Sequence, residues 1–186
     1  MSSLGVNIAI LNENRILLTR REDFEVWCLP GGAVDERESL AQAAVREAHE
    51  ETGLEVELLR LVGVYSQPNW HEDGSHIVLF AARPAGGQIC PQSSEVLEIA
   101  YFAQCELPEL ILFGQQRRIK DAFAGVVGAV WSQEDEWPFD RHLSRQELYA
   151  MRDRSGLSRQ DFYRKYFAHL NVDQDRLEVP PYKING

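Results

Sequence analysis

A short window near the start of the chain, residues 32–54, places several glutamates on a helix that follows two glycines. Glu47, Glu50 and Glu51 stand three and four positions apart, and at about 100° per residue they share one flank of that helix. Like charges at this spacing repel each other. A helix that keeps them needs a compensating contact, so the window constrains both the local fold and its chemistry.

The apolar side chains of the same helix fill an arc of roughly 140° on a helical wheel. They are Leu40, Ala41, Ala44, Val45 and Ala48. Glu51 falls inside this arc, and Glu47 falls on its edge, so we expect at least one carboxylate to point towards a core. A buried anion costs several kcal/mol unless it is neutralised, and Arg37 and Arg46 are too few for the glutamates around them. A divalent cation is the simplest remedy, and oxygen ligands favour Mg²⁺, with Mn²⁺ as the alternative.

The spacing of these residues matches a family pattern. Gly32, then Glu38 after five residues, then R-E-A-H-E-E-T-G-L at 46–54 after seven more, resemble the Nudix box with every fixed position filled. The preceding W-C-L-P-G-G at 27–32 also resembles the approach to that box. The resemblance covers about residues 4–124. It implies an α/β fold, the Nudix-type α/β/α sandwich with a mixed sheet.

The resemblance also implies roles for individual residues. The expected metal ligands are the carboxylates of Glu47, Glu50 and Glu51, with the Gly32 carbonyl as a further candidate. Arg46 is expected to pair with Glu38 and brace the helix, and both a support role and a catalytic role stay open for it. The base that activates a water is open between Glu50 and Glu95. Glu95 precedes a predicted strand, where family members often take a base, and a solvated loop acid is the other interpretation.

The reaction implied is the Mg²⁺-dependent hydrolysis of a phosphoanhydride by a pyrophosphohydrolase. The substrate would be a small-molecule nucleotide in which a nucleoside diphosphate is linked to another moiety. Nucleoside triphosphates, ADP-ribose and other nucleotide sugars, dinucleotides and cofactor pyrophosphates all stay open, because selectivity lies in loops outside the box. The alternative is a noncatalytic Nudix-fold protein that senses a ligand or regulates. The intact set of repelling carboxylates favours the enzyme.

Four further residues are candidates for substrate binding. Arg20 and Arg21 stand at the end of a predicted strand that leads to the site, where they could clamp phosphates or be solvated. Trp27 and Trp70 could stack on a base or a sugar, or pack in the core or a loop.

The order of elements predicts a sheet with helices on both sides. Alternating and apolar runs predict strands at 5–11, 15–20, 55–65, 76–82 and 98–102. The first two form a hairpin, and a helix is predicted at 115–123. Ser39 with Gln42 predicts a capping box for the helix of the window, and Gly53 predicts its end. By the resemblance, these elements would make up a Nudix hydrolase domain at 1–124 that contains every strand of the sheet.

The chain changes character in the expected helical extension, residues 125–186. L-S-R-Q-E-L-Y at 143–149 is echoed by L-S-R-Q-D-F-Y at 157–163, and each copy has a serine cap, so we predict two short helices. The segment 145–165 carries six cations and three acids. Three roles stay open: a pair packing its aromatic face on the domain or on a second subunit of a homodimer, a lid that brings cations to substrate phosphates, and a nucleic-acid contact. The tail, 179–186, is expected to be an extended strap or disordered.

Composition narrows the class of protein further. A net charge of −10 disfavours nonspecific binding to nucleic acid or to anionic lipid, so we expect no nucleic-acid partner. The chain has no run of about 18 apolar residues and no signal-peptide pattern at its start, which predicts a cytoplasmic protein without a membrane partner. Three widely spaced cysteines argue against a disulfide framework and a zinc site.

Overall fold

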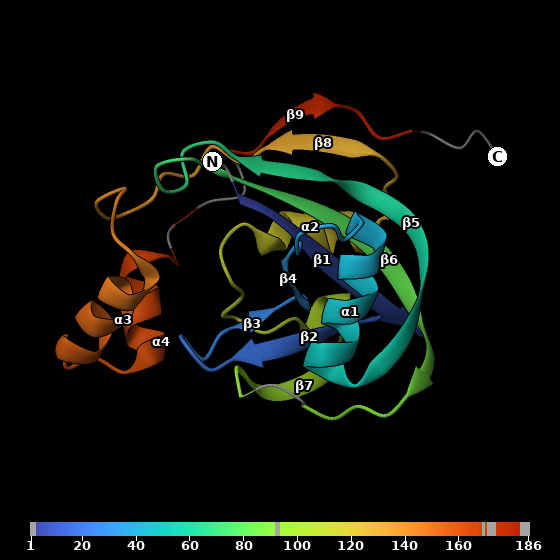
Figure 1. Ribbon diagram of the computed structural model, residues 1–186, viewed down its shortest axis with the longest axis horizontal. Helices are drawn as coiled ribbons and strands as arrows, with labels where there is room; N and C mark the ends of the chain where they lie inside the picture. Colours follow the sequence, from blue (N-terminus) through green and yellow to red (C-terminus); the bar gives the residue numbers. More distant parts are fainter. Residues whose placement is uncertain (1–2, 92–93, 169, 171–173, 183–186) are drawn as a thin grey trace.

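The computed structural model describes residues 3–91, 94–168, 170 and 174–182 of the 186-residue chain. Its strands are β1 (Ser3–Asn12), β2 (Arg15–Arg21), β3 (Trp27–Cys28), β4 (Gly31–Ala33), β5 (Leu54–Gln67), β6 (Ser75–Gly87), β7 (Val96–Ala103), β8 (Ala129–Ser132) and β9 (Arg176–Val179). Its helices are α1 (Leu40–Thr52), the 3₁₀ helix η1 (Gln104–Glu106), α2 (Gln115–Phe123), α3 (Arg145–Arg154) and α4 (Arg159–Tyr166). Figure 1 labels all of these strands and the helices α1 to α4.

Within the described residues, nine strands form one mixed sheet in the order β3-β2-β1-β6-β5-β8-β9, with β4 paired to β1 and β7 paired to β2. Strands β1 and β6 run parallel, as do β5 and β8, while the other pairs are antiparallel. The predicted hairpin of β1 and β2 and the other predicted strands are confirmed.

The short strands β8 and β9 were not predicted from the sequence. The expectation that every strand precedes residue 125 is wrong, because β8 pairs with β5 at Gly63 and Ala129, and β9 pairs with β8. A strand of four residues is too short to show an alternating pattern. The segment after residue 125 is therefore not purely helical, and the division into 1–124 and 125–186 stays a prediction.

Helices cover both faces of the sheet, which confirms the α/β/α sandwich (Figure 1). Helix α1 packs Ala43, Ala44 and Ala48 against one face, and each of these side chains is fully buried. Helix α2 packs Ile119 and Ala122 against the other face. Small side chains let α1 approach the strands closely, which fixes the distance between the sheet and the flank of α1 that carries Glu47, Glu50 and Glu51.

The apolar face predicted for α1 is wrong in part. Ala41 and Val45 are exposed, and Ala43, which the helical wheel left out of the arc, is buried. The buried side of α1 is therefore rotated towards Ala43 and Thr52.

The two predicted helices of the extension are confirmed as α3 and α4, which lie together at one side of the sandwich (Figure 1). Their aromatic face is buried on the chain's own sandwich, in what we call the junction cluster. Its buried members are Phe24, Val26, Trp70, Trp137, Leu148, Phe162, Tyr163 and Phe167. Of the expected strap, Tyr182 donates its backbone N–H to the Val127 carbonyl at 2.9 Å, and residues 183–186 lie outside the described residues.

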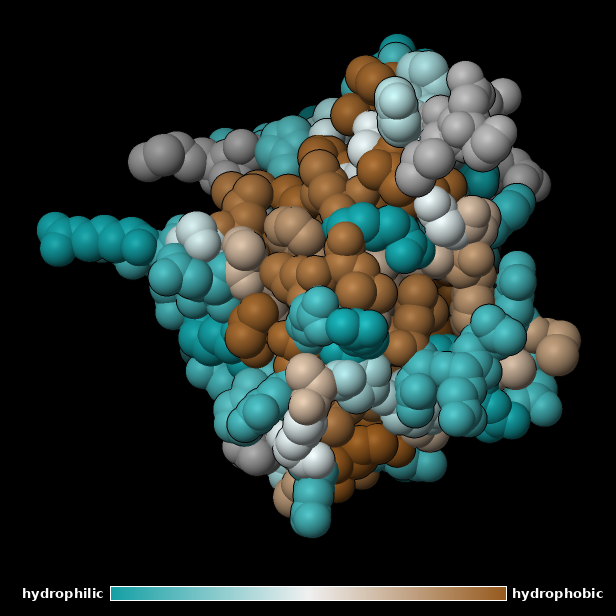
Figure 2. Space-filling view, turned by 90° about the vertical axis from the view of Figure 1, so that its right-hand side faces the viewer, coloured by the Kyte–Doolittle hydropathy of each residue, from teal (hydrophilic) through white to brown (hydrophobic). Residues whose placement is uncertain are grey.

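The side of the molecule that faces away from α3 and α4 carries an apolar surface. Figure 2 shows hydrophobic side chains gathered over the middle of this side. Leu59 and Leu61 on β5, and Leu177 and Val179 on β9, are among the exposed apolar side chains of the described residues. Among the same residues, no helix is both long enough and apolar enough to cross a membrane.

Candidate active site

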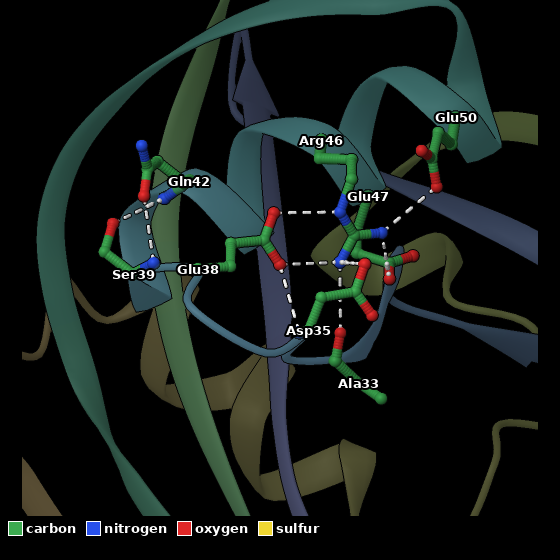
Figure 3. A network of polar contacts seen from close by, with 8 residues as sticks. All are labelled: Ala33, Asp35, Glu38, Ser39, Gln42, Arg46, Glu47 and Glu50. Atoms are coloured by element: carbon green, nitrogen blue, oxygen red, sulfur yellow. Dashed lines mark hydrogen bonds and ion pairs between the residues drawn. The ribbon is translucent and has the colours of Figure 1, made fainter.

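Helix α1 begins and ends as its sequence predicts. The Ser39 side chain accepts a hydrogen bond from the Gln42 backbone N–H, and the Gln42 side chain accepts one from the Ser39 N–H, which completes the capping box (Figure 3). Gly53 ends the helix in the left-handed conformation, with φ 73°. These two ends fix which residues face the Gly31–Gly32 turn.

Arg46 is the centre of the polar network on α1 (Figure 3). Its Nε and Nη2 atoms donate to the two carboxylate oxygens of Glu38, each at 2.9 Å, so the predicted pair is confirmed as bidentate. Its Nη1 donates to Glu47 Oε1 at 2.7 Å and to Glu50 Oε2 at 3.1 Å. Its Nη2 also lies 3.8 Å from Asp35 Oδ2, so one guanidinium compensates four carboxylates in part, and Glu51 is not among them.

Glu47 lies directly over the Gly32 backbone. A Cβ atom at residue 32 would stand 2.5 Å from Glu47 Oε1, so glycine leaves room for the carboxylate. Burial raises the pKa of Glu47 above its ordinary value, against the hydrogen bond and the charge of Arg46.

Glu51 is the carboxylate that the sequence expected to point inwards. Its Oε2 atom accepts a hydrogen bond from the Gly31 N–H at 3.2 Å. Burial raises the pKa of Glu51 to about 7, and the charges of Glu47 and Glu95 add to this effect, while the Gly31 hydrogen bond and Arg21 oppose it. The described contacts of Glu51 therefore do not offset the cost of burying its charge.

Glu47, Glu50 and Glu51, which we call the glutamate cluster, fit a hard divalent cation by the chemistry of their oxygen donors. Among the described residues, no three acidic, histidine or cysteine side chains converge closely enough, as they stand, to form a metal site. Glu47 and Glu50 are instead drawn onto Arg46, and Glu51 onto the Gly31 N–H. The space over Gly32 and the raised pKa values of Glu47 and Glu51 suit a cation beside that backbone.

A cleft of about 320 Å³ lies beside the Gly31–Gly32 backbone, and we call it the glycine cleft. Its lining includes Asn7, Arg21, Gly31, Gly32, Trp70 and Arg118. Arg21 reaches the cleft with its guanidinium paired to Asp23, at 2.6 Å between Nη2 and Oδ2. Trp70 lines the cleft as well, although its exposed fraction is only 8%.

Two of the candidate residues lie elsewhere. Arg20 pairs with Glu98 on the neighbouring strand β7, at 3.3 Å, and is absent from the lining of the glycine cleft. Trp27 packs edge-on against Phe102 with ring centroids 4.8 Å apart, and it is also absent from that lining.

Glu95 lies close to the glutamate cluster. It immediately precedes β7, its backbone carbonyl accepts from the Glu22 N–H at 2.8 Å, and its charge contributes to the raised pKa of Glu51. It also lines a small cavity of about 80 Å³ together with Arg21 and Tyr149.

Arg118 and Arg145 also line the glycine cleft. Arg118 was not singled out from the sequence, and Arg145 was considered only as one of the six cations of the segment 145–165. Arg118 is buried on α2, where Nη1 donates to Asn7 Oδ1 at 3.0 Å and Nη2 to Gln133 Oε1 at 2.9 Å. Its Nε has no hydrogen-bond partner among the described residues, and burial lowers its pKa to about 10, so the side chain stays charged at neutral pH. The only sequence signal was a cation among the apolar positions of a predicted helix, a pattern that solvated arginines also give.

Comparison with known proteins identifies the family. The family model described as NUDIX domain matches residues 1–123. The chain belongs to the NUDIX family. The match confirms the resemblance that rests on the box, and it ends before β8 and the helices α3 and α4.

The relatives are named as a diphosphatase and as pyrophosphatases. A protein of Bacillus subtilis (strain 168), provisionally named an 8-oxo-dGTP diphosphatase, is 38% identical over 122 residues, which is 65% of this chain and 80% of that protein. The ADP-ribose pyrophosphatase of Methanocaldococcus jannaschii is 34% identical over 123 residues, or 64% and 72% of the two chains. The crystal structure of an ADP-ribose pyrophosphatase from Streptococcus suis 89-1591 matches with a TM-score of 0.59 and 28% identity, covering 67% of this chain and 92% of that one. These matches support a NUDIX pyrophosphohydrolase that acts on acid anhydrides.

Proposed function

We propose that the protein is a Mg²⁺-dependent hydrolase of the pyrophosphate linkage in a nucleoside diphosphate joined to another moiety. Substrates of this class include nucleotide sugars such as ADP-ribose and nucleoside triphosphates. The observation that carries the proposal is the glutamate cluster, where Glu47 and Glu51 lie against the glycine backbone with raised pKa values. Carboxylates in such a state are stabilised by a bound cation.

The residues of the cluster then have distinct tasks. Glu47, Glu50 and Glu51 would hold the cation, with the Gly32 carbonyl as a further ligand, and Arg46 would keep two of these carboxylates in place. A bound divalent cation neutralises phosphate oxygens and lowers the pKa of a water. Glu50 or Glu95 would accept the proton of that water. Arg21 and Trp70 would bind the substrate from the wall of the glycine cleft.

The proposed partners follow from the site and the charge of the chain. The ligand is a small nucleotide, and nucleic acid is disfavoured by the net charge of −10. A homodimer would use the apolar side that faces away from α3 and α4 (Figure 2), because the aromatic face of α3 and α4 is buried in the junction cluster. We expect the protein to work in the cytoplasm.

A substrate panel in ¹⁸O-water tests the proposal. The wild-type protein is incubated with Mg²⁺ and with ADP-ribose, nucleoside triphosphates, 8-oxo-dGTP or dinucleotides, and the released phosphate, pyrophosphate or nucleotide is measured. We expect turnover of at least one compound, no turnover with excess EDTA, and ¹⁸O on a phosphorus. Label on a sugar carbon, or turnover that survives EDTA, would assign the protein to another reaction class.

A further inference from the structure

Arg145 brings the C-terminal extension to the edge of the glycine cleft. It is the first residue of α3 and lies beyond the residues that match the NUDIX domain, yet it lines the cleft together with Gly31, Gly32 and Arg21. It also lines a second cavity of about 190 Å³ between the helix pair and the sandwich. Arg145 stands where the two cavities meet, because they share five lining residues, Arg21, Trp70, Leu112, Phe113 and Arg145.

Arg145 has no ion-pair partner among the described residues, and its side chain is exposed. Glu22 and Asp23, which line the cavity of about 80 Å³ with it, are paired with Arg159 and Arg21. An arginine without an acidic partner at a cleft of a chain with net charge −10 is available to an anionic ligand.

The position of Arg145 is fixed by contacts further along the helix pair. The Tyr149 hydroxyl donates to Asp23 Oδ2 at 2.9 Å, and Arg152 Nη1 donates to the Asp23 carbonyl. Gln160 Nε2 donates to the Glu25 carbonyl at 3.0 Å. These bonds dock α3 and α4 onto the turn that follows Arg21. The backbone of Arg145 is thereby held on the same wall as Arg21, and the exposed side chain needs no rearrangement of the fold to reach a ligand.

We propose that Arg145 binds a phosphate group of the substrate, so that the extension is part of the active site. The inference rests on the proposed function, because it requires a diphosphate in the glycine cleft. A guanidinium is suited to this task, since it presents paired N–H donors to phosphate oxygens. Arg145 is then a binding residue that sets affinity, and the glutamate cluster carries out the chemistry without it.

Binding of a nucleotide that resists hydrolysis tests the role of Arg145 apart from turnover. The probe is adenosine 5′-(α,β-methylene)diphosphate, titrated with Mg²⁺ into wild-type protein, Arg145→Ala and Arg154→Ala by calorimetry. Arg154 is the matched control, since it lies on the same helix, is exposed and bonds only to the Ala150 carbonyl among the described residues. Loss of a charge-assisted hydrogen bond predicts about tenfold weaker binding for Arg145→Ala, and nearly unchanged binding for Arg154→Ala.

Turnover separates this inference from the proposed function. With the best substrate of the panel, KM of Arg145→Ala should rise about tenfold while kcat stays near the wild-type value. Equal affinities in all three proteins, an equal loss in both variants, or no binding of the probe to wild-type protein would overturn the role of Arg145. Failure of the proposed function has a different signature, which is binding of the probe without turnover of any compound in the panel.

Discussion

The glutamate cluster and the turn at Asp23, which lies beside the junction cluster, treat buried carboxylates in opposite ways. Burial raises the pKa values of Glu47 and Glu51, and the contacts around them do not reverse the effect. Burial also acts to raise the pKa of Asp23, but hydrogen bonds from Arg21, Tyr149 and the Phe24 N–H bring it below the ordinary value. The glutamate cluster leaves the pKa values of Glu47 and Glu51 raised, whereas the contacts of Asp23 lower its pKa.

This difference separates function from stability. The junction cluster combines buried aromatic rings with matched charges, as Phe162 and Tyr163 show beside the Arg159–Glu22 pair. Such a region stabilises the folded chain without help from a ligand. The glutamate cluster lowers the stability of the chain when no ligand is bound. A site of this kind is a candidate for binding a ligand that compensates its buried carboxylates, here a cation.

The largest expected effect is on stability: a substitution in the junction cluster should destabilise the fold and leave kcat unchanged. Phe162→Ala removes a fully buried ring and should lower the free energy of unfolding by about 3 to 5 kcal/mol. Urea denaturation followed by circular dichroism measures the change. Leu157→Ala, at a side chain 41% exposed, is the control and should change it by less than about 0.5 kcal/mol. A stable Phe162→Ala protein that has lost its kcat would contradict the separation.

Substitutions in the glutamate cluster should have the reverse effect, lowering kcat and leaving the fold stable. Glu50→Gln and Glu51→Gln should each lower kcat at least about 100-fold with saturating Mg²⁺, because each removes an anionic ligand, which corresponds to about 2.7 kcal/mol. Their free energy of unfolding should equal or exceed that of the wild type, since repulsion is relieved. Glu57→Gln, at an exposed pair with Arg83, is the control and should retain its turnover. Wild-type turnover in both Glu50→Gln and Glu51→Gln would show that the glutamate cluster is not the active site.

A smaller effect is expected in the pH dependence of the free energy of unfolding. Because the pKa of Glu51 is raised to about 7, the folded chain binds this proton more tightly than the unfolded chain does. Without metal, this contribution to stability is present below the unfolded pKa and is lost as pH rises through about 7, by about 1 to 2 kcal/mol for a half-buried group. Urea titrations with EDTA at pH 5 and pH 8 measure it. From pH 5 to pH 8 the wild type should lose stability relative to Glu51→Gln. An equal change in the free energy of unfolding of the two proteins would contradict the raised pKa of Glu51.

Much of the glutamate cluster could be predicted from local sequence. Ser39, Gln42 and Gly53 define the ends of α1 through contacts within a few residues, and the helical period then places Glu51 inwards. The pairing of Arg46 with Glu38 followed from the resemblance to the box. The exact buried face did not follow, because the strands beneath α1 select Ala43 over Val45.

Contacts between distant segments could not be predicted in the same way. Arg145 reaches the glycine cleft only because α3 docks on the turn at Asp23, and nothing local to α3 specifies that partner. The strand β8 is short and depends on an existing edge at β5. Arg118 likewise is indistinguishable from a solvated arginine until Asn7 and Gln133 are brought beside it.

Direct metal binding tests the central claim. This claim is that the carboxylates of the glutamate cluster are undercompensated in the metal-free chain because the cluster binds a divalent cation. Mn²⁺ is titrated into wild-type protein and Glu51→Gln without substrate, and free Mn²⁺ is followed by electron paramagnetic resonance. We predict at least one site in the wild type and at least about tenfold weaker binding in the variant, since a charged oxygen ligand is lost. Equal Mn²⁺ affinity in the two proteins would contradict the account.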